Sequence, residues 1–105
     1  MYRQGDILIK SVDELDTTNL IELKRDKQDR IVLAYGEVTG HAHAIKNKNS
    51  VLMQDKKTNK IYLMILSNTV DLIHEEHATI KLPMGNYEVK RQREYTPERI
   101  VYVKD

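Results

Sequence analysis

An all-β fold, either a small barrel or a sandwich of about eight to nine short strands, is predicted by three features of the sequence. Short runs rich in β-branched and aromatic residues recur along the 105-residue chain. Polar turn signals separate these runs at intervals of about 8–12 residues. No segment carries a convincing 3.6-residue apolar period, so no amphipathic helix is expected. The length is that of one domain, residues 1–105, with one hydrophobic core.

The first half of the chain alternates apolar runs with polar connections. Strands are predicted over residues 7–12, 20–23 and 31–35. The intervening residues 13–19 leave room for one short helical turn at most, and the charged residues 24–30 are interpreted as a solvated turn. The run Ile31–Tyr35 is continuously apolar, which is typical of a strand buried on both faces.

The next strand carries a pair of histidines, within the segment Gly36-Glu-Val-Thr-Gly-His-Ala-His-Ala-Ile45. His41 and His43 are two residues apart, so both side chains project from one face of an extended strand. Gly36 and Gly40 precede them and are expected to form a bulge or to permit close approach of the backbone to a ligand.

Further strands are predicted in the second half of the chain. They cover residues 51–54, 61–66, 70–74, 78–82, 86–95 and 100–103, with turn signals between them. The run 61–66 is the most apolar and is expected to be central in its sheet. Alternation over 70–74 places His74 on the apolar face of its strand.

Composition limits the classes of function. With 40% hydrophobic and 31% charged residues and a net charge of +1, the chain has no global field to attract nucleic acid or an anionic membrane. No run of about 18 apolar residues and no signal peptide is present, so a cytoplasmic location is expected. The absence of cysteine excludes disulfides, thiolate metal ligands and a cysteine nucleophile.

The four histidines form two pairs and are the candidate metal ligands. His41 and His43 would share the ion with His74, and His77 or a nearby glutamate would complete the site. Imidazole and carboxylate suit zinc, iron, manganese or nickel. Three protein ligands with an open position would favour catalysis. In a metal-free alternative, Glu37, Glu75 or Glu76 would orient a histidine as general base.

The strand Arg91-Gln-Arg-Glu-Tyr95 is a second candidate site. Arg91 and Arg93 lie in one register, so their guanidinium groups would select an anionic ligand if that face lines a cavity. Otherwise they pair with surface carboxylates. The strip also has the basic and aromatic character of a nucleic-acid surface, but acidic neighbours dilute its charge. The catalytic candidates are therefore Glu37, Glu75 and Arg91.

The motifs resemble known sequences at two levels. The segment 36–45, together with His74-Glu-Glu-His77 and the run from Leu82 to Glu98, resembles an uncharacterised family of small prokaryotic and phage-type proteins, a resemblance that implies no activity. More distantly, His41 and His43 resemble the histidine pair of the cupins, which are metal-binding β-barrels. The cupin glutamate is absent after this pair, and His74 precedes the Pro83-Met-Gly85 turn instead of following it.

Three hypotheses follow from the sequence. The first is a metal-binding β-barrel protein, and if catalytic a metal-dependent hydrolase, isomerase or oxygenase acting on a small polar or anionic substrate. The second is a non-catalytic module that binds protein or nucleic acid through the Arg91–Tyr95 strand. The third is a structural homo-oligomer with histidines at its interface, since a domain this small can complete its core as a homodimer.

Overall fold

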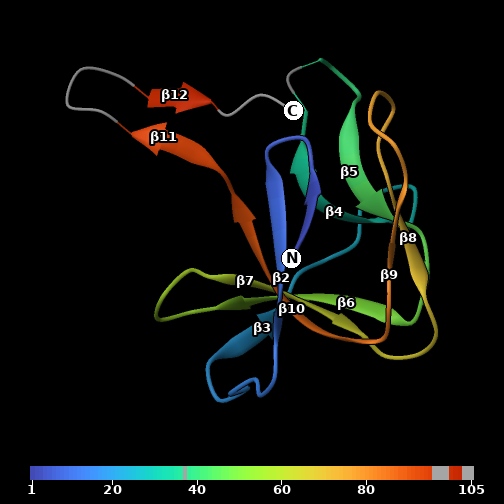
Figure 1. Cartoon of the computed structure of the whole chain (residues 1–105). Coiled ribbons are helices and arrows are strands. Elements are labelled where there is room, and N and C mark those ends of the chain that lie inside the picture. Colours follow the sequence, from blue (N-terminus) through green and yellow to red (C-terminus); the bar gives the residue numbers. More distant parts are fainter. Residues whose placement is uncertain (37, 96–99, 103–105) are drawn as a thin grey trace.

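The computed structural model describes residues 1–36, 38–95 and 100–102, and it confirms the all-β prediction. Within these residues the regular structure consists of strands, arranged in a six-stranded, a four-stranded and a two-stranded antiparallel sheet (Figure 1). In this part of the chain, no helix is long and apolar enough to cross a membrane.

The larger sheet forms one layer of a sandwich. Its strands, in spatial order, are β1 (Tyr2–Gln4), β2 (Ile7–Val12), β10 (Gly85–Arg91), β7 (Ile61–Ile65), β6 (Ser50–Asp55) and β3 (Leu20–Glu22). The pairing of β2 with β10 sets Ile9 opposite Val89, and both side chains are buried. The predicted central strand, β7, lies between β10 and β6 as expected.

The second layer is the four-stranded sheet. Its spatial order is β4 (Ile31–Tyr35), β5 (Ala42–Ile45), β8 (Val70–Ile73) and β9 (Ile80–Leu82). All four residues of β5 are buried, whereas only Ile31 of β4 is, so the prediction that β4 is buried on both faces was wrong. Side chains from both sheets form one apolar cluster, which includes Ile9, Ile45, Leu63 and Leu72. Within the described residues neither sheet closes on itself, so the architecture is sandwich-like.

The predicted strand over 86–95 is interrupted at Gln92. The Gln92 N–H donates to the Asp6 carbonyl at 2.6 Å, so the chain leaves the ladder of β10 and continues as β11 (Arg93–Tyr95). Strand β11 pairs with β12 (Ile100–Tyr102), and this hairpin extends away from the two larger sheets (Figure 1).

The N-terminal strand β1 is an element that the sequence analysis missed. Tyr2 pairs with Ile9 and Gln4 with Ile7, so Gly5 and Asp6 form a hairpin turn instead of opening a strand. Gly5 has a φ of +58°, in the left-handed region that glycine adopts without strain. The hairpin places Gln4 at the edge of the larger sheet.

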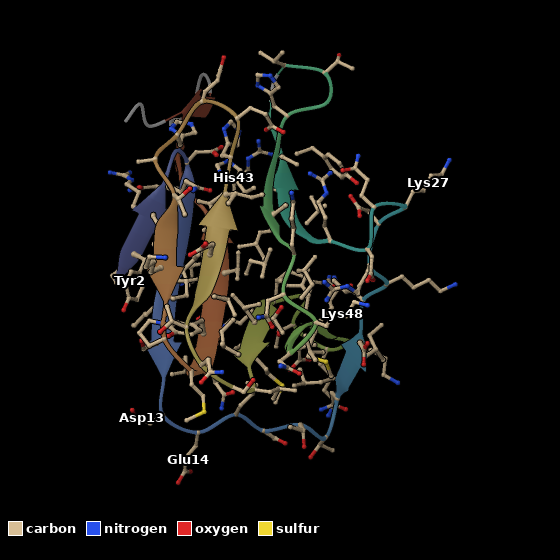
Figure 2. All side chains as sticks on the ribbon, turned by 90° about the vertical axis from the view of Figure 1, so that its right-hand side faces the viewer. Tyr2, Asp13, Glu14, Lys27, His43 and Lys48 are labelled. Carbon is tan, nitrogen blue, oxygen red and sulfur yellow. The ribbon has the colours of Figure 1, made fainter. Side chains whose placement is uncertain are left out.

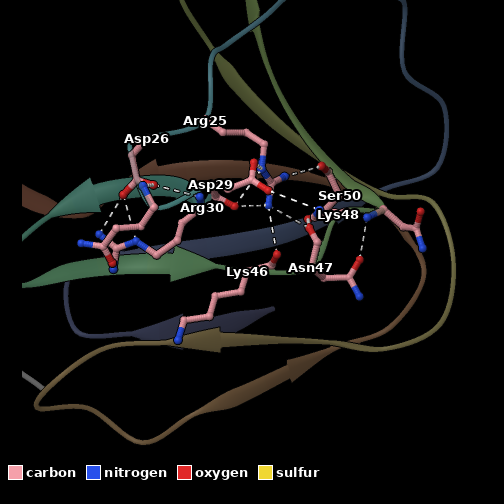
Figure 3. A network of polar contacts seen from close by, with 10 residues as sticks. Arg25, Asp26, Asp29, Arg30, Lys46, Asn47, Lys48 and Ser50 are labelled. Atoms are coloured by element: carbon pink, nitrogen blue, oxygen red, sulfur yellow. Dashed lines mark hydrogen bonds and ion pairs between the residues drawn. The ribbon is translucent and has the colours of Figure 1, made fainter.

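The charged segment 24–30 is a structured anchor and not a freely solvated turn (Figure 3). The Arg25 guanidinium donates to the carbonyls of Asp29, Lys46, Asn47 and Ser50 at 2.8–3.3 Å. Its side chain is only 21% exposed and also pairs with the Asp29 carboxylate. Arg25 therefore fastens the β3–β4 connection to the β5–β6 turn.

We expect Arg25→Met to lower the free energy of unfolding by about 1–3 kcal/mol, because it removes several hydrogen bonds from a charged donor but keeps the aliphatic stem. Urea denaturation measures the change. The matched control is Lys27→Met, at an exposed position of the same loop, which should cost less than about 0.5 kcal/mol. Equal effects of the two substitutions would contradict the anchoring role.

Candidate functional site

The four histidines converge at one end of the sandwich, opposite the loop that carries Asp13 and Glu14 (Figure 2, where His43 is labelled). His43 belongs to β5, and His74 follows β8 directly. Strands β5 and β8 are antiparallel neighbours, with Ala44 opposite Ile73, so the start of β5 lies beside the end of β8. This pairing brings together two histidine pairs that are 31 residues apart in the sequence.

The rings form a compact cluster. Their centroids are separated by 4.4 Å for His43 and His74, 4.6 Å for His74 and His77, and 5.8 Å for His41 and His74. His43 is 2% exposed, whereas the other three are only partly buried. The cluster therefore runs from the apolar core to the surface, where Glu75 and Glu76 are exposed.

Two glycines line the cluster closely. A Cβ on Gly5 would lie 2.9 Å from His77 Nε2 and 3.2 Å from His43 Cε1. A Cβ on Gly36 would lie 3.1 Å from His41 Cβ and 3.2 Å from His74 Nε2. The backbone thus approaches the rings from two segments. Any larger residue at Gly5 would clash with the His77 ring and would have to adopt an unfavourable positive φ.

Gln4 determines the tautomer of His43. The Gln4 side chain is buried, and its amide Nε2 donates to the carbonyls of Leu72 and Ala78 at 2.9 and 3.0 Å. This orientation leaves Gln4 Oε1 as an acceptor 2.9 Å from His43 Nδ1. His43 must therefore carry a proton on Nδ1, and its Nε2 lies 3.9 Å from Asp6 Oδ1.

The pKa values of two of the imidazoles, His43 and His74, are lowered. Burial, reinforced by the neighbouring His74, lowers the pKa of His43 to about 4, against the opposing effect of Asp6. Burial and the proximity of His77 also lower the pKa of His74. Neutral imidazole is the form that binds a metal or accepts a proton. The pKa of Glu75 is lowered because its carboxylate accepts the Ala42 backbone N–H at 2.9 Å.

One group of donor atoms has the spacing of metal ligands. His41, His74 and Glu75 each contribute one atom, and these atoms lie within 4.8 Å of one another. His41 Nδ1 is buried without a hydrogen-bond partner, and the Glu76 carboxylate oxygen is 3.9 Å from it. A buried polar atom without a partner costs roughly 1–3 kcal/mol, and coordination to a cation would remove that cost. These residues fit a metal ion.

Arg91 lies beside the cluster but is bound to other groups. Its Nε donates to Asp6 Oδ2 at 2.7 Å and its Nη2 to the Tyr35 carbonyl at 3.1 Å. Arg91 therefore balances the charge of Asp6, as in the alternative that the sequence left open, in which the arginines pair with carboxylates. Two other candidates, Glu37 and the side chain of Arg93, lie outside the described residues.

Sequence reasoning missed Gln4 and Asp6, although one signal for them exists. Gly5-Asp6 between two extended runs is a dipeptide typical of a two-residue hairpin turn. That turn predicts β1, but nothing in it indicates that Gln4 reaches the histidines, because their contact depends on the packing of the two sheets.

The tautomer of His43 can be measured directly. At pH 7, long-range ¹H–¹⁵N spectra should show His43 protonated on Nδ1 and unprotonated on Nε2, because Gln4 Oε1 can only accept. In Gln4→Leu this preference should be lost, and the free energy of unfolding should fall by about 2–4 kcal/mol as buried donors and acceptors lose partners. A proton on Nε2 in the wild-type protein would contradict the assignment.

The pKa of His43 also predicts how stability depends on pH. Because the folded-state value is depressed from 6.5 to about 4, the unfolded chain takes up a proton first as the pH falls. The free energy of unfolding should therefore be highest above pH 6.5 and decrease towards pH 4, by up to about 3 kcal/mol from this group. Urea titrations across this range test it, and His43→Gln should flatten the profile. A flat wild-type profile between pH 6.5 and 4.5 would disprove it.

Comparison with known proteins identifies the family to which the chain belongs. Neither the curated proteins nor the solved structures compared with the chain include a significant match. The model of one family matches residues 3–92, a range that contains Gln4, Asp6, all four histidines and Arg91. The chain belongs to this uncharacterised family, described as a domain of unknown function, DUF8820.

Proposed function

We propose that this protein binds a divalent transition metal ion at its histidine cluster. The observation that carries the proposal is the convergence of all four histidines of the chain, with one buried ring nitrogen, His41 Nδ1, that has no hydrogen-bond partner. His41, His74 and Glu75 are the proposed ligands, and the rings of His43 and His77 lie next to that of His74.

The chemistry of these donors favours zinc, iron, manganese or nickel. Neutral imidazoles and an ionised carboxylate suit these ions, and the chain has no thiolate to select a softer metal. Glu75 accepts the Ala42 N–H through Oε1, which orients the carboxylate and leaves Oε2 for a cation. Gln4 similarly orients the His43 ring.

The hydrogen bonding of His74 bears on how it could hold an ion. Its Nδ1 accepts the Glu76 backbone N–H at 3.0 Å, so the proton of the neutral ring is on Nε2. If Nε2 were the ligand atom, this proton would have to move to Nδ1, which could then no longer accept the Glu76 N–H. The segment 74–77 is therefore expected to adjust on metal binding.

An ion held by three protein ligands leaves a position open for water or substrate, and this extends the proposal to a metal-dependent enzyme. Its substrate would be a small polar or anionic molecule. Glu75 and Arg91 remain the described candidates for catalytic roles. The alternative of a non-catalytic module built on the Arg91–Tyr95 strand has less support, because Arg91 is bound to Asp6 and Tyr35.

Metal binding should appear both as metal content and as added stability. Elemental analysis of untagged protein should find one of the four metals, and zinc at a free concentration of 100 Kd should raise the free energy of unfolding by about 2.7 kcal/mol. In His41→Ala and His74→Ala this increase should disappear, because each substitution removes a proposed ligand.

The matched control is Asp71→Asn, which removes an exposed carboxylate three residues before His74 and should leave the metal effect unchanged. Metal-free native protein whose unfolding transition does not move with any of the four ions would disprove the proposal. Full metal affinity in both histidine variants would disprove the ligand assignment.

A further inference from the structure

Arg91, the last residue of β10, joins three segments at the histidine end of the molecule. Its Nε donates to the Asp6 carboxylate at 2.7 Å, and its Nη2 donates to the Tyr35 carbonyl at 3.1 Å. The next residue, Gln92, donates its backbone N–H to the Asp6 carbonyl. Asp6 belongs to the β1–β2 turn and Tyr35 ends β4, so Arg91 connects the two larger sheets.

The peptide that Arg91 holds leads directly into the histidine cluster. The Tyr35 carbonyl and the Gly36 N–H belong to one planar peptide unit. Arg91 donates to the carbonyl of this unit, and its N–H donates to the His41 carbonyl at 2.8 Å. A Cβ on Gly36 would lie 3.1 Å from His41 Cβ and 3.2 Å from His74 Nε2, closer than an ordinary van der Waals contact. The Gly36 backbone therefore packs against two of the three proposed metal ligands.

We propose that Arg91 is a positioning residue for the metal site. Through the Tyr35–Gly36 peptide it fixes the backbone against which His41 and His74 pack. The inference rests on the proposed metal-binding function, because it concerns the ligands of that ion. Groups that orient metal ligands from outside typically contribute 10–100-fold to metal affinity, and we expect about tenfold here because a peptide lies between Arg91 and the ligands.

This role requires the shape of the guanidinium as well as its charge. A guanidinium donates from Nε and Nη2 in fixed directions, whereas an ammonium is a compact charge on a flexible stem. Arg91→Lys therefore keeps a positive charge beside Asp6 but loses the fork that joins this carboxylate to the Tyr35 carbonyl. The substitution separates positioning of the peptide from simple charge balance.

The test is a titration of metal-free protein with cobalt(II), which lies between iron and nickel in affinity for such sites and whose visible absorption depends on ligand geometry. Arg91→Lys should bind cobalt about tenfold more weakly than the wild-type protein, with a shifted visible spectrum. A purely structural role of Arg91 would lower the free energy of unfolding but leave the spectrum of the cobalt-bound protein unchanged.

Gly36→Ala is a second, independent variant. Gly36 does not have a positive φ, so its backbone conformation accepts alanine, and the hydrogen bonds of the peptide are kept. The added Cβ would meet His41 and His74, so this variant should also bind cobalt more weakly and with a shifted spectrum. Wild-type affinity together with a wild-type spectrum in Gly36→Ala would overturn the proposal.

The matched control is Lys90→Arg, the converse substitution on the neighbouring residue. Lys90 pairs with Glu88 and lies on the other face of β10, so the change should alter cobalt affinity by less than about twofold. Wild-type affinity and spectrum in Arg91→Lys would overturn the positioning role and leave Arg91 with charge balance alone.

A measurement on the wild-type protein remains decisive if a variant fails to fold. Because coupling between two sites is reciprocal, saturation with zinc should slow the solvent exchange of the Arg91 Nε–H in ¹H–¹⁵N spectra. An unchanged exchange rate in zinc-saturated protein would overturn this inference alone. If the wild-type protein binds neither cobalt nor zinc, the proposed function fails and this inference fails with it.

Discussion

The buried amide of Gln4 is the interaction on which this end of the molecule depends. A primary amide removed from water is costly unless its groups find partners, and here three groups from different parts of the chain supply them. The carbonyls of Leu72 and Ala78 belong to the four-stranded side of the sandwich, and the ring of His43 belongs to β5. One side chain on an edge strand thus joins both sheets and orients the most buried histidine.

Charge is distributed around this amide in a consistent way. His43 is kept neutral by burial, and Asp6 next to it is balanced by Arg91. Arg3, on the other side of the β1–β2 hairpin, contacts only the neutral side chain of Gln92 among the described polar partners. The ionisable groups nearest the amide are therefore either neutral or paired.

The sequence predicted the local part of this arrangement and not its assembly. Strand alternation predicted that His41 and His43 project from one face, because the two-residue period of a strand is a local property. In the structure β5 begins at Ala42, so His41 lies just before the strand, and the rings of His41 and His43 each lie next to that of His74. The contact between β5 and β8 could not be predicted, since strand order depends on the packing of both sheets. Likewise, nothing in the sequence distinguishes Arg25 from the other charged residues of segment 24–30, because its four carbonyl partners are brought together only by the fold. Gln4 belongs to no motif, so its contact with His43 could not be predicted either.

The same physical reasoning explains why the outer histidines differ from the inner one. His43 has a complete hydrogen-bond partner on Nδ1, so folding alone determines its state. His41 Nδ1 has no such partner, and His74 uses its Nδ1 lone pair on the Glu76 backbone, an arrangement that coordination would break. Among the described residues, the fold thus orders the His43 ring and leaves one buried ring nitrogen, His41 Nδ1, without a partner. A buried polar atom without a hydrogen-bond partner lowers stability, and a bound ligand can remove that cost. This atom belongs to the part of the cluster that is only partly buried, where a ligand can reach it.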